Sequence, residues 1–154
     1  MHSDELDAFW SRARAAEPSL PLEAPTAWAF GATAQHADDL LNLVLAGIKT
    51  GTATAMADFG DDEPVPVVGE LSIILDGSGT PRAVLEVTSL EVLPFDEVGE
   101  EHARAEGEGD RTLASWRRIH ESFWRAHGSE GFAPDMPVLC ERFRLIHPRS
   151  APTP

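Results

Sequence analysis

The segment that begins at Lys49 places one amine and three hydroxyl groups within six residues, because Thr50, Thr52 and Thr54 follow it. Lys49 is the only lysine of the chain, and the remaining basic residues are all arginine. A lysine removed from water loses its proton more readily and can act as a base or nucleophile, whereas arginine stays charged. Lys49 is therefore a candidate site residue. The alternative is an exposed lysine beside threonines that simply favour a strand.

A second candidate group is the run Glu106-Gly-Glu108-Gly-Asp110, in which three carboxylates alternate with glycines. Oxygen ligands on a flexible loop suit a hard cation, so Glu108 and Asp110 are candidates for binding Mg²⁺ or Mn²⁺. The alternative is a solvated acidic loop before a helix, where acidic residues are favoured in any case. No phosphate-cradling glycine loop occurs in the sequence, and we expect no organic cofactor.

Other residues could contact a substrate. In a strand over 136–147, Glu141 shares a face with apolar residues such as Phe143, so it must reach a polar pocket or pair with an arginine. Trp28 lies off every apolar stripe and could form a ligand wall, whereas Cys140 resembles a small buried hydrophobe. The predicted substrate-binding residues are Thr50, Thr54, Trp28, Glu141 and Arg142.

The elements that must position these residues follow from apolar periodicity and turn residues. Helical spacing predicts helices over 4–16, 34–46 and 113–126, with Thr33 and Thr112 as N-caps of the last two. Alternation predicts strands over 49–54, 69–75, 82–92 and 136–147, and loops over 57–66 and 96–110. The order predicts one α+β domain over 1–147, built on a small antiparallel sheet or barrel. The tail 148–154 is predicted to be disordered.

Composition limits the function further. The chain has 154 residues, 42% of them hydrophobic, which suits one soluble domain. A formal net charge of −14 argues against a general binder of nucleic acids or anionic membranes. The single cysteine excludes an intramolecular disulfide, and neither a membrane span nor a secretory signal is visible, so we expect a cytoplasmic protein.

Several pieces of the sequence, in this order, resemble the ASCH-domain family and cover about residues 28–146. They are Ala37-Asp-Asp-Leu40 with Leu43-Val-Leu-Ala-Gly-Ile-Lys-Thr50, Val68-Gly-Glu70, Phe95-Asp-Glu-Val98, Glu106-Gly-Glu-Gly-Asp110 before Trp116, and Met136-Pro-Val-Leu-Cys-Glu-Arg-Phe143. The chain looks like the longer bacterial branch of that family, which carries an N-terminal helix. The resemblance implies a PUA-like antiparallel β-barrel flanked by helices, with a cleft beside the first barrel strand.

The same resemblance implies two kinds of chemistry. Some ASCH-domain proteins are metal-dependent ribonucleases that act on single-stranded RNA. A shorter branch hydrolyses the amide of N4-acylated cytidines with a lysine, a threonine and a glutamate, which Lys49, Thr52 and Glu106 match. In that role Glu106 would orient Lys49 or exchange a proton with it, and Lys49 would activate or hold Thr52. The chain departs from that branch in the residues around Thr52 and in the insertion 107–110.

We therefore predict an ASCH-domain hydrolase that acts on RNA, first as a metal-dependent ribonuclease on single-stranded RNA, with Lys49 central to the cleft. The alternatives are an amidohydrolase of N4-acylated cytidines and a non-catalytic module that binds RNA or a nucleoside. Expected partners are short single-stranded RNA or a modified nucleoside or nucleotide, without membrane or DNA. The negative charge favours small ligands over long RNA. A local basic patch could still form from Arg111, Arg117, Arg118, Arg142 and Arg144.

Overall fold

The computed structural model describes residues 2–60 and 63–148. Its helices are α1 (His2–Ala16), α2 (Ala34–Leu45), α3 (Glu100–Glu106) and α4 (Leu113–His127). Its strands are β1 (Ala27–Trp28), β2 (Gly51–Ala55), β3 (Leu71–Leu75), β4 (Pro81–Pro94) and β5 (Pro137–His147). The predicted tail lies outside the described residues, apart from Pro148.

The five strands form one sheet in the order β1-β3-β4-β5-β2. β1 runs parallel to β3, and the other neighbouring pairs are antiparallel. The prediction of an α+β fold is confirmed, but the expected purely antiparallel sheet is corrected to a mixed one. Closure into a barrel is not seen, because no pairing joins β1 to β2 within the described part of the chain.

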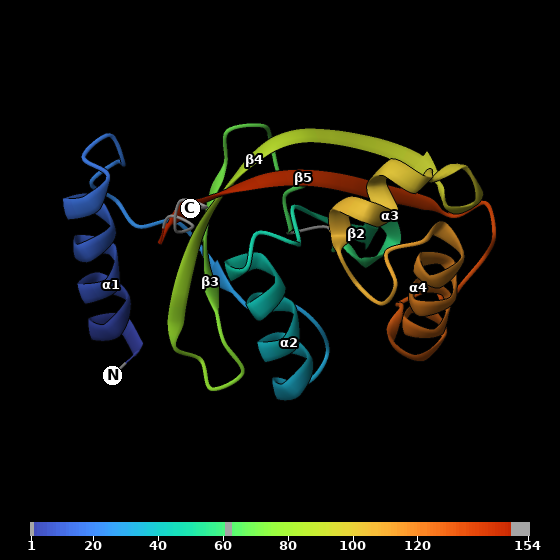
Figure 1. Ribbon diagram of the computed structural model, residues 1–154, viewed down its shortest axis with the longest axis horizontal. Helices are drawn as coiled ribbons and strands as arrows, with labels where there is room; N and C mark the ends of the chain where they lie inside the picture. The colour runs from blue at the N-terminus through green and yellow to red at the C-terminus, as the bar shows by residue number, and fades with distance from the viewer. Residues whose placement is uncertain (1, 61–62, 149–154) are drawn as a thin grey trace.

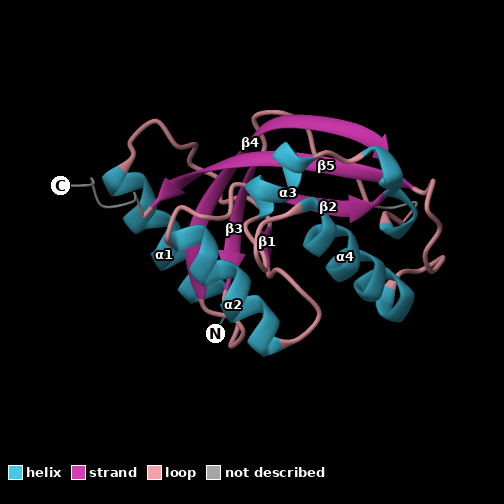
Figure 2. Cartoon of the chain, turned by 45° about the vertical axis from the view of Figure 1, so that its right-hand side comes forward, coloured by secondary structure: helices cyan, strands magenta, loops and turns pink. Residues whose placement is uncertain are grey.

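The helices cover the sheet in three places (Figures 1 and 2). α1 buries Phe9 and Trp10 against β3 and β4. α2 buries Leu41 and its neighbours against the middle of the sheet. α3 and α4 close the far end, where Trp116 and Trp124 lie in a cluster with residues of β2 and β5. The site described below lies where the second and third of these layers meet.

Local signals placed two helices correctly. The Thr33 side chain accepts a hydrogen bond from the backbone N–H of His36, and Thr112 accepts one from that of Ser115, so both predicted N-caps are confirmed. α3 and β1 were not predicted. α3 lies within the segment 96–110 that we expected to be a loop, and β1 has only two residues, too few to show a periodicity.

Within the described residues, no helix combines the length and apolar character that crossing a bilayer requires.

Candidate functional site

Lys49 lies just before β2, in the short connection from α2. The backbone N–H of Lys49 donates to the Leu43 carbonyl at 3.0 Å, which anchors the connection to the end of α2. The backbone N–H of the next residue, Thr50, donates to the Ala105 carbonyl at 2.6 Å. Because Ala105 precedes Glu106 at the C-terminal end of α3, these backbone contacts bring the lysine and the glutamate together.

The Lys49 ammonium group is enclosed by oxygen atoms. Nζ donates a hydrogen bond to the Gly51 carbonyl at 2.8 Å and lies 3.7 Å from both Glu106 Oε1 and Glu108 Oε2. It also lies 5.4 Å from the centre of the Phe30 ring. Only 1% of the lysine side chain is exposed. Because the lysine is buried, the alternative of an exposed lysine is wrong. The surrounding oxygen atoms compensate for the loss of hydration that burial imposes on the ammonium group.

Glu106 is buried at the centre of the hydrogen-bond network. Its Oε2 accepts a hydrogen bond from the Trp116 indole N–H at 2.6 Å and lies 2.7 Å from His102 Nε2, while Oε1 lies 3.0 Å from His120 Nε2. Burial alone would raise the pKa of Glu106. The charge of His120, the hydrogen bonds from both histidines and the charge of Lys49 outweigh burial and hold that pKa well below its ordinary value. Glu106 is therefore ionised at neutral pH and is a buried counterion of both Lys49 and His120.

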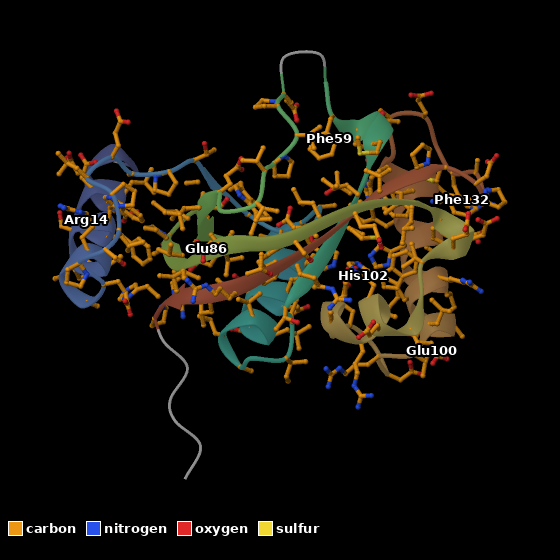
Figure 3. All side chains as sticks on the ribbon, turned by 90° about the horizontal axis from the view of Figure 1, so that it is seen from above. Arg14, Phe59, Glu86, Glu100, His102 and Phe132 are labelled. Carbon is orange, nitrogen blue, oxygen red and sulfur yellow. The ribbon has the colours of Figure 1, made fainter. Side chains whose placement is uncertain are left out.

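The two histidines that contact Glu106 have different partners at their other ring nitrogen. His120 Nδ1 lies 2.8 Å from the Trp116 carbonyl, which only accepts, so Nδ1 and Nε2 both carry protons and His120 is a cation. Burial works against this charge, but the charge of Glu106 raises the pKa of His120 above its ordinary value. His102, which is labelled in Figure 3, instead has its Nδ1 3.5 Å from Arg142 Nε, which donates to it.

Gly107 places the second carboxylate of the site. It ends α3 in the left-handed conformation with φ of +73°, which turns the chain so that Glu108 returns toward Lys49. A Cβ atom at this position would lie 2.9 Å from Ile48 Cγ2 and 3.0 Å from the Ile48 carbonyl oxygen. Glycine is therefore required here both by conformation and by the close approach of the chain that leads to Lys49.

Gly107→Ala is expected to lower the free energy of unfolding by about 2–4 kcal/mol, combining the cost of a left-handed alanine with that of the close contact. The matched control is Gly131→Ala, because Gly131 has φ of +71° but no atom within 4 Å of an added Cβ. That variant should lose only about 1–2 kcal/mol in urea denaturation. Equal losses in the two variants would show that the contact with Ile48 is unimportant.

The predicted metal ligands are separated in the structure. Asp110 is exposed, and its carboxylate accepts hydrogen bonds from the backbone N–H and hydroxyl of Thr112, which account for its lowered pKa. Glu108 instead joins Glu106 and His120, whose ligand atoms all lie within 4.8 Å of one another. This group fits a metal poorly, since the Lys49 ammonium already lies between the two glutamates and His120 is protonated.

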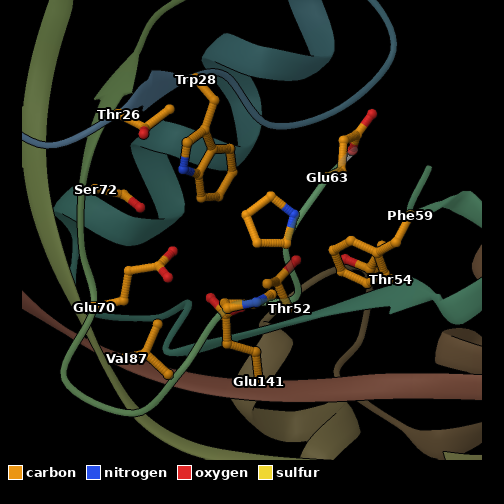
Figure 4. Close-up of a pocket in the computed structure, with 12 residues that line it drawn as sticks. Thr26, Trp28, Thr52, Thr54, Phe59, Glu63, Glu70, Ser72, Val87 and Glu141 are labelled. Carbon is orange, nitrogen blue, oxygen red and sulfur yellow. The ribbon is translucent and has the colours of Figure 1, made fainter. Parts of the chain in front are cut away.

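Thr52 connects two hollows on either side of β2. The smaller one, of about 80 Å³, is lined by Lys49, Glu106, Glu108 and His120 together with Thr52. The larger one, of about 400 Å³, lies on the other side, and Thr52 and Thr54 form part of its wall (Figure 4). Every strand contributes to this larger cavity, which therefore occupies the inside of the curved sheet. Its lining from the strands and their ends comprises Thr26, Trp28, Thr52, Thr54, Ser72, Val87 and Glu141.

The other predicted binding residues divide between two faces of the sheet. Trp28, Thr54 and Glu141 line the larger cavity, whereas Arg142 lines a separate hollow with His102 and Cys140. Thr50 is exposed, and its hydroxyl donates to the Ala105 carbonyl at 3.5 Å, away from both hollows. Cys140 is buried and its pKa is raised to about 12 by burial and nearby carboxylates, so it remains a thiol.

The histidines of the site were missed by sequence reasoning. A signal was present, because His102 and Glu106, like Trp116 and His120, stand four residues apart and so share a helix face. The pair of His102 and Glu106 could be recognised only if a helix had been predicted there, but the segment 96–110 was predicted to be a loop. The Trp116 ring stacks on His120 with 4.3 Å between ring centres, which fixes the second pair.

The fold and the site define an α+β domain with a buried lysine–carboxylate centre beside a cavity inside a curved sheet. The chain belongs to the ASCH-domain family, whose model matches residues 26–147, so α1 precedes the matched region. This confirms the resemblance seen in the sequence.

Solved structures agree with this assignment. The protein EF3133 from Enterococcus faecalis V583, of family DUF984, is 30% identical with a TM-score of 0.82, covering 94% of this chain and 91% of its own. An ASCH domain from Lactobacillus crispatus JV V101 is 26% identical with a TM-score of 0.82, covering 93% and 94%. The hypothetical protein PH0355, at 12% identity and a TM-score of 0.55 over 79% and 98%, shares the fold alone. No curated protein matches the chain.

Proposed function

We propose that the protein is a hydrolase that cleaves an amide on a small nucleoside derivative, with Lys49 at the centre of the reaction. The observation that carries this proposal is the enclosure of the Lys49 ammonium by Gly51, Glu106 and Glu108, beside a threonine that reaches the larger cavity. A buried, oriented ammonium can donate to an oxygen on which negative charge develops. The cavity volume of about 400 Å³ lies in the range of small-molecule sites.

The charge of the larger cavity supports a nucleoside rather than RNA as the proposed substrate. Three carboxyl groups line it, from Glu63, Glu70 and Glu141, and no lysine or arginine is among its described lining residues. Affinity for RNA depends largely on basic side chains that neutralise phosphates. The cavity therefore favours a ligand without phosphate, and for this reason we rank the amidohydrolase ahead of the ribonuclease that the sequence predicts first.

The roles in this reaction follow from the positions of the side chains. Water adds across the amide: the C–N bond breaks, the acyl carbon gains a hydroxyl group and the leaving nitrogen gains a proton. Lys49 donates toward the reacting oxygen, and Thr52 supplies a hydroxyl group at the wall that the two hollows share. Glu106 positions Lys49 and does not exchange protons at neutral pH, because its pKa is held low.

A metal-dependent ribonuclease is the second candidate function. The observation that favours it is the convergence of Glu106, Glu108 and His120, a set of donors that a divalent ion could use. Binding would require an ion to displace the Lys49 ammonium and a proton from His120, which is why this candidate ranks second.

One set of assays separates these functions. The protein is incubated with N4-acetylcytidine, with its 5′-phosphate and with single-stranded RNA, in Mg²⁺, Mn²⁺ or EDTA, and products are separated by chromatography. We expect release of cytidine and acetate that persists in EDTA and is faster without the phosphate. Lys49→Arg keeps the charge and should abolish turnover, with its folding checked by thermal unfolding.

Either of two assay results would overturn the proposal, and a third would overturn the role of Lys49. Cleavage of RNA in Mg²⁺ but not in EDTA, without turnover of the nucleoside, would establish the second candidate. Binding of the nucleoside without turnover under every condition would indicate a recognition module. Turnover that survives in Lys49→Arg would exclude proton transfer by the lysine.

A further inference from the structure

Glu141 lines the larger cavity, and its carboxyl group has no hydrogen-bond or ion-pair partner among the described residues. It lies on β5 directly opposite Thr52 of β2 in the strand register, and its side chain faces the cavity. Because residues 2–60 and 63–148 offer its carboxyl group no such contact, the prediction that Glu141 forms a structural pair with an arginine is wrong. A half-buried carboxyl without an internal partner is available to a ligand.

A second carboxyl group lies near Glu141. Glu70, in the segment that leads into β3, lines the same cavity, and Figure 4 shows both side chains on the side opposite Trp28. Burial, helped by the charge of Glu70 and opposed by the charge of Lys49, raises the pKa of Glu141 to about 7. Glu63, across the loop that follows β2, is the other titratable group in this lining.

We propose that Glu141 is the residue that selects the ligand of this cavity, by donating a hydrogen bond from its carboxyl group to a ring nitrogen of a heteroaromatic ring held against Trp28. This inference deepens the proposed function and rests on it for the identity of the ligand as a nucleoside.

The chemistry of a neutral carboxyl group defines the kind of ring. Its hydroxyl donates and its carbonyl oxygen accepts in one plane. It therefore pairs with a ring edge on which an acceptor nitrogen adjoins an N–H group, as in cytosine and adenine. An ionised carboxylate only accepts and would leave that ring nitrogen unpaired. Trp28 lines the cavity beside Thr26 and offers an aromatic surface for stacking.

Binding, measured by calorimetry from pH 5.5 to 8.5, tests the inference with cytidine and adenosine, neither of which carries an acyl group. Glu141 must be protonated to donate, so affinity should be constant well below pH 7 and fall above it. Loss of one proton predicts a decrease of about 30-fold by pH 8.5. Glu141→Gln keeps a donor and an acceptor, and its affinity should not depend on pH.

Two neighbouring variants control for charge. Removing the charge of Glu70 lowers the pKa of Glu141, so Glu70→Gln should move the loss of affinity to lower pH. Glu63 lines the same cavity but is not among the groups that shift the pKa of Glu141. Glu63→Gln should therefore leave unchanged the pH at which half of the affinity is lost. Neither variant alters Lys49 or its partners.

The results that overturn this inference differ from those that overturn the proposed function. Absence of binding of both nucleosides, pH-independent binding by the natural protein, or an unchanged pH profile in Glu141→Gln would exclude it, even if amides are hydrolysed. A profile that changes as expected, without hydrolysis of N4-acetylcytidine, would support Glu141 as the selecting residue and reject the hydrolase.

Discussion

Glu106→Gln is expected to lower the free energy of unfolding by about 3–5 kcal/mol, which is the usual cost of removing one partner from a buried ion pair. The substitution changes almost no volume, yet it leaves Lys49 and the cationic His120 without their shared counterion. It also places an amide N–H₂ group where donors already converge, because Trp116 and His102 both donate to this side chain. Urea denaturation followed by tryptophan fluorescence measures the effect.

Glu108→Gln is the matched control for this prediction. Glu108 Oε2 lies at the same 3.7 Å from Lys49 Nζ as Glu106 Oε1, but 15% of its side chain is exposed, against 1% for Glu106. Water can therefore replace the lost charge, and we expect a change below about 1 kcal/mol. Similar decreases in the free energy of unfolding of the two variants would contradict the prediction that Glu106 is the more important counterion of Lys49.

The fold was predictable where the chain carries long periodic segments. α2 and α4 were identified from apolar spacing with Thr33 and Thr112 as caps, and both boundaries agree with the structure within two residues. α3 was missed because it is a seven-residue helix rich in charged residues, and its buried face consists of residues such as His102 and Glu106 rather than large apolar ones. Tertiary contacts, not local propensity, stabilise such a helix.

The candidate site was predictable only in part, for a related reason. The position of Lys49 and its pairing with Glu106 followed from the resemblance and are consistent with the geometry. The contact between Glu106 and His120 joins α3 to α4 and depends on how the two helices pack, which no spacing along the sequence encodes. Asp110 stands only two residues after Glu108, but its carboxylate accepts a hydrogen bond from the backbone N–H of Thr112. Short polar side chains commonly form such bonds with nearby backbone.

The chain has a net charge of −14, but its acidic groups are balanced to different extents in the two hollows of the site. In the smaller hollow the carboxylates of Glu106 and Glu108 are matched by Lys49 and His120, so little net charge remains there. In the larger cavity, no basic residue of the described lining matches the carboxyl groups. The acidic composition therefore acts where a ligand would bind, and it opposes phosphate at that position.

Thr52→Val is expected to reduce turnover of the nucleoside amide by at least about 100-fold, the effect of removing one group that acts on the reacting atoms. Valine has the shape of threonine and favours a strand equally well. Within the described residues, no hydrogen bond engages the Thr52 hydroxyl, so its removal should leave β2 and the stability of the protein unchanged. Initial rates with N4-acetylcytidine at saturating and limiting concentrations measure the loss.

Thr52→Ser and Thr54→Val complete the comparison. Serine keeps the hydroxyl group, so Thr52→Ser should retain most of the activity. Thr54 is on the same face of β2, two residues further on, but lines only the larger cavity, so Thr54→Val should affect KM more than kcat. Equal losses in Thr52→Val and Thr54→Val would place the reaction away from Lys49. Loss in Thr52→Val with retention in Thr52→Ser would assign the hydroxyl group a chemical role, because the two variants differ from threonine by similar changes in volume and only one of them removes the oxygen.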